Sequence, residues 1–183
     1  MSIARLAVVA TLLAVPARAE VLKAAEAGFT TRNAVTVAAP PAQVWALLVQ
    51  PSRWWNPAHS WSGDAGNFSL DARAGGCFCE RLKDGGSVEH QRVLRAEPGL
   101  MLRLSGGLGP LQAQAVTAVL GWELKAEGGG TRLTQTYAVS GLADGGLAGW
   151  AAPVDGVVRE QLERLARTVE TGRPEAPAKA AAQ

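Results

Sequence analysis

Hydrophobic and polar positions follow two different periods in the first third of the chain. Apolar residues alternate with polar ones over residues 33–38 (NAVTVA), which predicts a strand. Beyond Pro41 they recur every three or four residues as far as Pro51, which predicts a short helix with proline in its first turn, where the missing N–H costs least. We expect residues 20–29 to be a short lead-in to this strand.

The middle of the chain consists of short apolar runs bounded by glycine and aspartate. They predict strands over residues 68–73, 76–82, 87–96, 100–105, 112–126 and 131–139. The turns between them are brief, whereas parallel neighbours would need crossovers of a dozen or more residues, so consecutive strands must run antiparallel. The sequence therefore predicts one curved antiparallel sheet.

A long amphipathic helix is predicted near the end of the chain. From Pro153 to about Thr171 apolar residues lie three and four positions apart, and Gly172 and Pro174 end the pattern. The concave face of the sheet is the large apolar surface that could cover this stripe. We therefore expect one α+β domain over residues 20–172, in which six to seven strands wrap around the C-terminal helix.

The first nineteen residues are typical of a cleavable signal peptide. Arg5 gives a positive start, residues 6–15 are apolar and uncharged, and the Ala-Arg-Ala of residues 17–19 supplies the small residues that signal peptidase requires. The apolar stretch is too short for a bilayer core, which needs roughly twenty residues. We expect a periplasmic or secreted protein without a stable membrane anchor, and a disordered tail over residues 173–183.

Charge narrows the classes of partner. The chain carries 18 Lys and Arg against 16 Asp and Glu, a net charge of +2. Arg5 and Arg18 would leave with the signal peptide, so the mature chain is close to neutral. It lacks the surplus of clustered basic residues that binding to nucleic acid or to an acidic membrane surface requires. We therefore expect no nucleic acid partner.

Four segments carry motifs in a characteristic order. VTVAAPPAQVWALL (35–48) joins the first strand to the first helix, AGGCFCE (74–80) contains a G-G-x-F-x-E-like strand, GGSVEHQRVLRAEPGLMLRL (85–104) forms a hairpin, and TRLTQTY (131–137) precedes the last helix. This order resembles the START/Bet v1-like superfamily, in particular the branch of Hsp90 ATPase activators and polyketide cyclase-like proteins. The resemblance covers about residues 30–172. It implies a helix-grip fold with an apolar cavity between sheet and last helix, a fold that hosts carriers, cyclases, receptors and co-chaperones.

Glu80 is a candidate for chemistry inside such a cavity. Phe78 and Glu80 share one face of an extended strand, and the neighbouring cysteines share the other. If Phe78 faces the cavity, Glu80 does too, and desolvation would raise its pKa so that it could act as an acid, a base or a ligand anchor. Alternatively, Glu80 lies at a sheet edge, pairs with an arginine or is solvated.

Cys77 and Cys79 admit three interpretations. Residues two apart in a strand are roughly 6.5–7 Å apart, at the outer limit for a disulfide, so a bond would need a local bulge. Two thiols could instead stay reduced if they are buried. A soft-metal site with His59 or His90 is the third alternative, but no spacing places those histidines near the pair, and we expect neither a metal nor a cofactor.

Other polar residues could orient a ligand. His90 alternates with Val88 and Arg92 on its strand, whereas His59 lies in an aromatic loop over residues 52–67. Four polar residues are expected on strands beside apolar positions: Gln112, Gln114, Gln135 and Tyr137. Each is equally consistent with an ordinary structural or solvent-facing position.

The six tryptophans fall into two groups. Trp45 in the first helix and Trp122 in a long strand are expected in the core, because large aromatic side chains dominate core burial. The other four lie in loops that would surround the cavity mouth: Trp54, Trp55, Trp61 and Trp150. They would either line a ligand site or cover the sheet edge and the last helix.

These residues favour a periplasmic protein that binds a hydrophobic or lipid-like small molecule without catalysis. Its candidate ligand-binding residues are Trp54, Trp55, His59, Trp61, Phe78, Glu80, Gln114, Trp122, Gln135, Tyr137 and Trp150. The alternative is a polyketide cyclase-like enzyme that uses Glu80, His90 and Tyr137 as acid and base, which fails if Glu80 and His90 lie on opposite faces of the sheet. A co-chaperone is the third hypothesis. The signal peptide argues against it, since Hsp90 partners are cytosolic.

Overall fold

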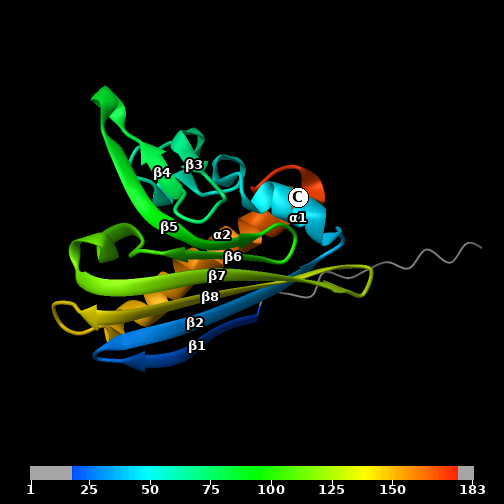
Figure 1. Cartoon of the computed structure of the whole chain (residues 1–183). Coiled ribbons are helices and arrows are strands. Elements are labelled where there is room, and N and C mark those ends of the chain that lie inside the picture. Colours follow the sequence, from blue (N-terminus) through cyan, green and yellow to red (C-terminus); the bar gives the residue numbers. More distant parts are fainter. Residues whose placement is uncertain (1–17, 177–183) are drawn as a thin grey trace, which may run out of the picture.

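The computed structural model describes residues 18–176 and shows an antiparallel sheet curved around a long helix (Figure 1). The strands are β1 (Arg18–Ala25), β2 (Gly28–Val37), β3 (Phe68–Leu70), β4 (Cys77–Arg81), β5 (Ser87–Glu97), β6 (Met101–Ser105), β7 (Ala115–Glu127) and β8 (Gly130–Leu142). Their order in the sheet is β1-β2-β8-β7-β6-β5-β4-β3. All neighbouring pairs are antiparallel.

Two α-helices accompany the sheet, α1 (Pro41–Leu48) and α2 (Ala151–Thr171). Short 3-10 turns complete the structure: η1 (Pro51–Arg53), η2 (Pro57–His59), η3 (Ala65–Asn67), η4 (Lys83–Gly85), η5 (Gly109–Ala113) and η6 (Ala148–Trp150). The long α2 crosses behind the sheet, and α1 lies beside its C-terminal end (Figure 1). This architecture confirms the predicted α+β helix-grip fold, with eight strands instead of six or seven.

The lead-in predicted over residues 20–29 is wrong, because this segment forms β1 and the start of β2. β1 is an edge strand that pairs only with β2. Its Val21 and Leu22 are 39% and 41% exposed, so no buried face imposes alternation on the sequence. Backbone pairing holds this strand in place, and a search for apolar periodicity therefore misses it.

A β-bulge in β5 changes the faces of its residues. Phe78 pairs with Gln91, but Cys79 pairs with Glu89, which leaves His90 as the extra residue. His90 and Gln91 are consequently both buried, with 5% and 1% of their surface exposed. A bulge redirects side chains in this way because it interrupts the strict alternation of a strand.

The helix α2 ends where the sequence predicts. Gly172 adopts a left-handed conformation with φ of 76°, and its N–H donates to the carbonyl of Thr168, as glycine commonly does after a helix. Leu162 and Leu165 are fully buried against the sheet. The C-terminal half of α2, which contains both leucines, forms a continuous core with the strands.

Several predictions concern residues outside the described part of the chain. They are most of the signal peptide, residues 1–17, and the end of the tail, residues 177–183. Arg18 and Ala19, which signal cleavage would remove, are the first residues of β1. Over residues 18–176, none of the helices combines the length and the hydrophobicity needed to cross a bilayer.

Candidate functional site

A cavity of about 420 Å³ lies between the first half of α2, the aromatic loop after η1 and the loop after β6. Indole rings and valines make up much of its wall: Trp55, Trp61, Trp150, Val154, Val157 and Val158. Leu108 and Pro110 close it on the side of the β6–β7 loop. Three polar side chains reach the cavity, those of His59, Ser60 and His90.

The aromatic loop is attached to both helices through main-chain groups. The Trp54 indole donates to the Leu47 carbonyl at 2.9 Å, and the Arg164 guanidinium donates to the Trp54 carbonyl at 2.9 Å. Trp54 is therefore a buried anchor, 2% exposed, and does not line the cavity. Trp55 follows it into the cavity wall, where its indole N–H donates to the His59 carbonyl at 2.9 Å.

The outer part of this loop rests on α2. The backbone N–H of Asn56 donates to Gln161 Oε1 at 2.7 Å, and its side-chain amide donates to Glu160. His59 Nε2 lies 3.1 Å from Glu160 Oε2, and about a third of both side chains is exposed. His59 thus belongs to the rim of the cavity.

Glu80 and His90 form a buried carboxylate–imidazole pair behind the cavity wall. Glu80 Oε2 lies 2.9 Å from His90 Nε2. The same carboxylate accepts the backbone N–H groups of Trp61 at 3.1 Å and of Ser62 at 2.6 Å. Glu80 is fully buried. The two residues lie on one face of the sheet because the bulge in β5 turns His90 inward.

Protonation of this pair follows from its surroundings. Burial alone would raise the pKa of Glu80, but the hydrogen bonds from Ser62, Trp61 and His90 outweigh it and hold that pKa below its ordinary value. Burial lowers the pKa of His90, and the hydrogen bond and charge of Glu80 only partly oppose this shift. Near neutral pH the pair is therefore an ionised carboxylate with a neutral imidazole.

An aromatic cluster surrounds this imidazole. The ring centroids of Phe68 and Phe78 lie 5.1 and 5.2 Å from that of His90. Trp55 contacts both phenylalanines, with centroid distances of 5.5 and 5.4 Å. Phe78 is thus part of the packing that holds His90 and does not line the cavity.

The loop after β6 is held by two side chains from other strands. The Gly106 carbonyl accepts from the Gln91 amide at 2.9 Å and from the Tyr137 hydroxyl at 3.3 Å. The same hydroxyl accepts the Leu108 N–H at 2.9 Å. Gly106 has φ of 143°, and a Cβ there would lie 2.7 Å from the His90 carbonyl. Only glycine fits this close passage.

Tyr137, the third predicted acid–base residue, is fully buried and does not line the cavity. Burial raises the pKa of its hydroxyl above the ordinary range, and the bond from the Leu108 N–H only partly opposes this. The hydroxyl stays protonated and anchors the loop.

The glutamines predicted near the ligand lie apart from the cavity wall. Gln135 is buried, and its hydrogen-bonding pattern orients the amide so that it accepts the Trp122 indole N–H at 3.2 Å and donates to the Val158 carbonyl at 3.0 Å. Gln112 and Gln114 are not on a strand, contrary to prediction. They lie in and just after η5, since a turn that starts at Gly109 delays β7 until Ala115.

Cys77 and Cys79 form a disulfide with a Cα–Cα distance of 5.4 Å. This is shorter than the roughly 6.5–7 Å of two extended residues, so the strand is locally contracted, next to the bulge in β5. Among residues 18–176, no three His, Cys, Asp or Glu side chains gather in a way that could hold a metal.

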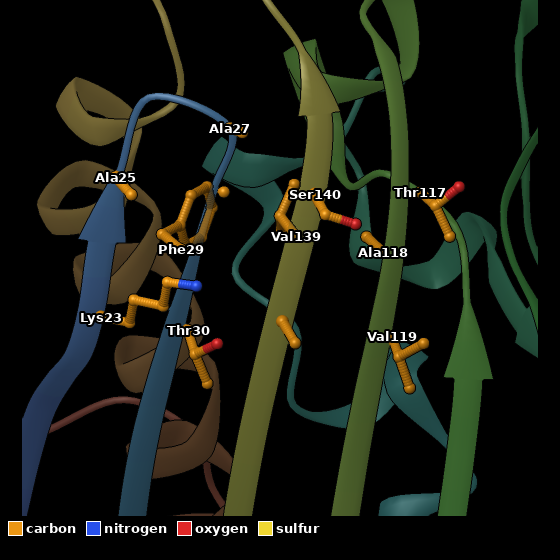
Figure 2. Close-up of a pocket in the computed structure, with 12 residues that line it drawn as sticks. Lys23, Ala25, Ala27, Phe29, Thr30, Thr117, Ala118, Val119, Val139 and Ser140 are labelled. Atoms are coloured by element: carbon orange, nitrogen blue, oxygen red, sulfur yellow. The ribbon is translucent and has the colours of Figure 1, made fainter.

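A second hollow of about 300 Å³ lies on the outer face of the sheet. Figure 2 shows Lys23, Thr30, Thr117, Val119 and Ser140 spread over four neighbouring strands. Apart from the buried Phe29, its side chains are short or exposed, and it brings no buried titratable groups together. The cavity beside α2 is therefore the candidate site.

Residues 28–170 match the family model described as polyketide cyclase / dehydrase and lipid transport. The chain belongs to this family. The match confirms the resemblance to the polyketide cyclase-like branch of the START/Bet v1-like superfamily. No curated protein matches the chain.

Solved structures show the same fold as this polyketide cyclase / dehydrase family member. CalU16 from Micromonospora echinospora has a TM-score of 0.54 and 20% identity, over 86% of this chain and 85% of its own. DynU16, a protein of the dynemicin biosynthetic locus, has a TM-score of 0.57 and 24% identity over 79% of this chain, which spans 48% of DynU16. EF2215 from Enterococcus faecalis has a TM-score of 0.58 and 13% identity, over 86% of this chain and 80% of its own. At these identities the likeness establishes the fold alone.

Of the predicted ligand-binding residues, the structure brings Trp55, His59, Trp61 and Trp150 to the cavity wall, with His90 beside them. The others stand behind the wall or elsewhere: Trp54, Phe78, Glu80, Gln114, Trp122, Gln135 and Tyr137. Sequence reasoning missed Leu108, Pro110 and the valines of α2. The valines were visible as part of the apolar stripe, but the stripe does not show which of its members meet a cavity.

Proposed function

We propose that this family member binds a hydrophobic small molecule in the cavity beside α2. The observation that carries the proposal is the cavity wall itself, in which three indole rings and three valines surround a space of about 420 Å³. This volume lies within the range of about 300–1,000 Å³ that ligand pockets occupy. The wall and its few polar groups favour an apolar ligand with one or two oriented polar atoms.

A space of this size calls for an explanation in an otherwise well-packed protein. The space is partly open to solvent, and it leaves apolar side chains accessible that packing would otherwise cover. Elsewhere along α2, Leu162 and Leu165 pack without exposed surface. The chain can therefore fill its interior, and the open space at the other end is consistent with a ligand site.

Native mass spectrometry tests this proposal on protein purified from its own host. We expect a co-purifying apolar molecule that is lost on denaturation. Val157→Phe provides the matched control, because this half-buried residue lines the cavity and a larger ring would occupy the space. A ligand that persists in Val157→Phe, or a wild-type protein that takes up no apolar molecule from the host extract, would contradict the proposal.

Acid–base catalysis is a second candidate function. The specific observation in its favour is that Glu80 and His90 lie on one face of the sheet, 2.9 Å apart, with His90 at the cavity. A neutral imidazole held by a carboxylate can accept a proton from a bound substrate. The α-protons of 2-tetralone would then exchange with deuterated solvent faster in the presence of wild-type protein than of His90→Phe. Equal rates with both proteins and with buffer would exclude this role for that class of ketone.

We further propose that the protein acts in the periplasm or outside the cell. The leader over residues 1–19 and the Cys77–Cys79 disulfide support this, since disulfides persist mainly in oxidising compartments. N-terminal sequencing of the protein from its host is expected to begin at Glu20. A cytosolic protein that retains residues 1–19 would refute the proposal.

A further inference from the structure

We infer that the ligand carries a hydroxyl group of the phenol or enol class, which donates a hydrogen bond to Nδ1 of His90. This inference rests on the proposed binding function and names the ligand chemistry that the cavity selects. Four features of the site support it: the tautomer of His90, the place of His90 in the cavity wall, the engagement of other polar groups and the charge behind the imidazole.

Glu80 determines the tautomer of His90. An ionised carboxylate can only accept hydrogen bonds, and Glu80 already accepts two backbone N–H groups. His90 Nε2, 2.9 Å from the carboxylate, must therefore carry the proton. In a neutral imidazole the other nitrogen is then an acceptor. Nδ1 of His90 thus presents a lone pair.

This lone pair has no partner among residues 18–176. The fully enclosed side-chain polar atoms without a hydrogen bond there are Thr31 Oγ1, Asn33 Oδ1 and Gln91 Oε1. His90 Nδ1 is not one of them, and His90 lines the cavity. Because Nδ1 is not fully enclosed and His90 lines the cavity, a donor on the ligand can reach this acceptor, while only 5% of the residue's surface is exposed.

Three other polar groups of the wall are already engaged. The Ser60 hydroxyl donates to the Pro57 carbonyl at 2.7 Å, and the Trp55 indole N–H donates to the His59 carbonyl at 2.9 Å. The His59 side chain pairs with Glu160 at the rim, 35% exposed. His90 therefore offers a side-chain acceptor at this cavity that is not engaged by the protein.

Charge and shape narrow the donor further. The negative charge of Glu80 directly behind the imidazole disfavours a carboxylate in the cavity, and an ammonium group would lose its hydration in the apolar wall. A neutral hydroxyl avoids both costs. The rings of Trp55, Trp61 and Trp150 in the wall suit a flat aromatic or conjugated body. Together these features point to a phenol or an enol.

Glu80 acts as a positioning residue for this contact. The same carboxylate that orients His90 also holds the backbone of Trp61 and Ser62 at the cavity mouth. The acceptor and one wall of the entrance therefore depend on one side chain.

Two probes of similar size test the inference, 2-naphthol and 2-methoxynaphthalene, of which only the first donates a hydrogen bond. We expect wild-type protein to bind 2-naphthol about tenfold more tightly in calorimetric titrations, as one buried hydrogen bond would allow. His90→Phe should lose this preference and bind the two probes with equal affinity. Equal affinity of wild-type protein for both probes would overturn the inference. Binding of neither probe would count against the proposed function itself.

Nitrogen NMR of the imidazole provides a test that needs no folded His90 variant. The chain has two histidines, so His59→Gln suffices to assign the signals. We expect protonated Nε2 and unprotonated Nδ1 in His90, and a change at Nδ1 when 2-naphthol is added. A proton on Nδ1 in the free protein, or a signal that 2-naphthol leaves unchanged while it binds, would refute the inference.

Discussion

The two halves of α2 face the same sheet but differ in how completely their apolar side chains are buried. In the C-terminal half, Leu162 and Leu165 are fully buried and Val169 is 8% exposed. In the N-terminal half, Val154 and Val157 are only half-buried and border the cavity. Both halves continue one amphipathic pattern, so the pattern alone does not explain the difference.

Side-chain size and neighbours account for the difference. The C-terminal half carries leucines and lies beside α1 (Figure 1), whereas the N-terminal half carries proline, glycine and valines and borders the cavity. The Glu80 carboxylate and the hydroxyl of Tyr137 hold the loops on either side of the cavity. A cavity in this fold thus arises from small residues on the helix together with loops that are prevented from collapsing onto them.

Leu165→Ala should have the largest effect. It removes a fully buried side chain from the packed half, and such changes cost about 2–5 kcal/mol. Urea denaturation would measure this loss, while Val154→Ala, at the cavity, should cost less than about 1 kcal/mol. Similar losses for the two variants would mean that the halves of α2 do not differ in packing.

Glu80→Leu should be the next most disruptive change. It leaves the N–H groups of Trp61 and Ser62 and the His90 imidazole without their acceptor, at a cost of about 2–4 kcal/mol. Glu89→Leu is the matched control on the same hairpin, because Glu89 forms an exposed ion pair with Arg92, for which about 0–1 kcal/mol is expected. A loss as small as that of the control would show that the Glu80 network does not support the cavity.

Acid should weaken the cavity end through His90. Burial lowers the pKa of His90 in the folded protein below the ordinary histidine value of 6.5. Below pH 6.5 the imidazole therefore binds a proton more readily in the unfolded chain than in the folded protein. The free energy of unfolding should therefore fall as the pH drops below about 6.5. Glu80, whose folded pKa lies below 4.5, should add a second decrease below that pH.

Urea denaturation over this pH range, in wild type and His90→Phe, measures the contribution of the imidazole. The decrease that begins near pH 6.5 should be weaker in the variant. Identical pH profiles of wild type and His90→Phe would show that the pKa of His90 is the same in the folded and the unfolded protein.

Val157→Leu should have the smallest effect on stability. The change places a leucine, the residue typical of the packed C-terminal half, in the N-terminal half of α2. The added methylene at the cavity should stabilise the fold by up to about 0.8 kcal/mol. The affinity for 2-methoxynaphthalene should fall several-fold, because the ligand loses space. Destabilisation with unchanged affinity would mean that the added group does not enter the cavity.

Periodicity in the sequence predicts most of the fold. The six strands between residues 68 and 139, the first helix and α2 are all found at or near their predicted positions, because each buries one apolar face. The edge strand β1 escaped prediction since it has no such face. The bulge at His90 escaped for a related reason, because alternation along one strand does not reveal an extra residue against its partner.

Local patterns in the chain predicted the antiparallel sheet and the long helix, and singled out Glu80, His90 and the loop tryptophans as candidates. The resemblance to a known superfamily added the helix-grip fold. The division of these candidates into cavity wall, supporting network and core depends on long-range packing. His90 faces the cavity because β5 bulges against β4, and Trp54 is core because Arg164 of α2 holds its carbonyl. Hydrogen bonds between residues far apart in sequence decide such placements, and no local period encodes them.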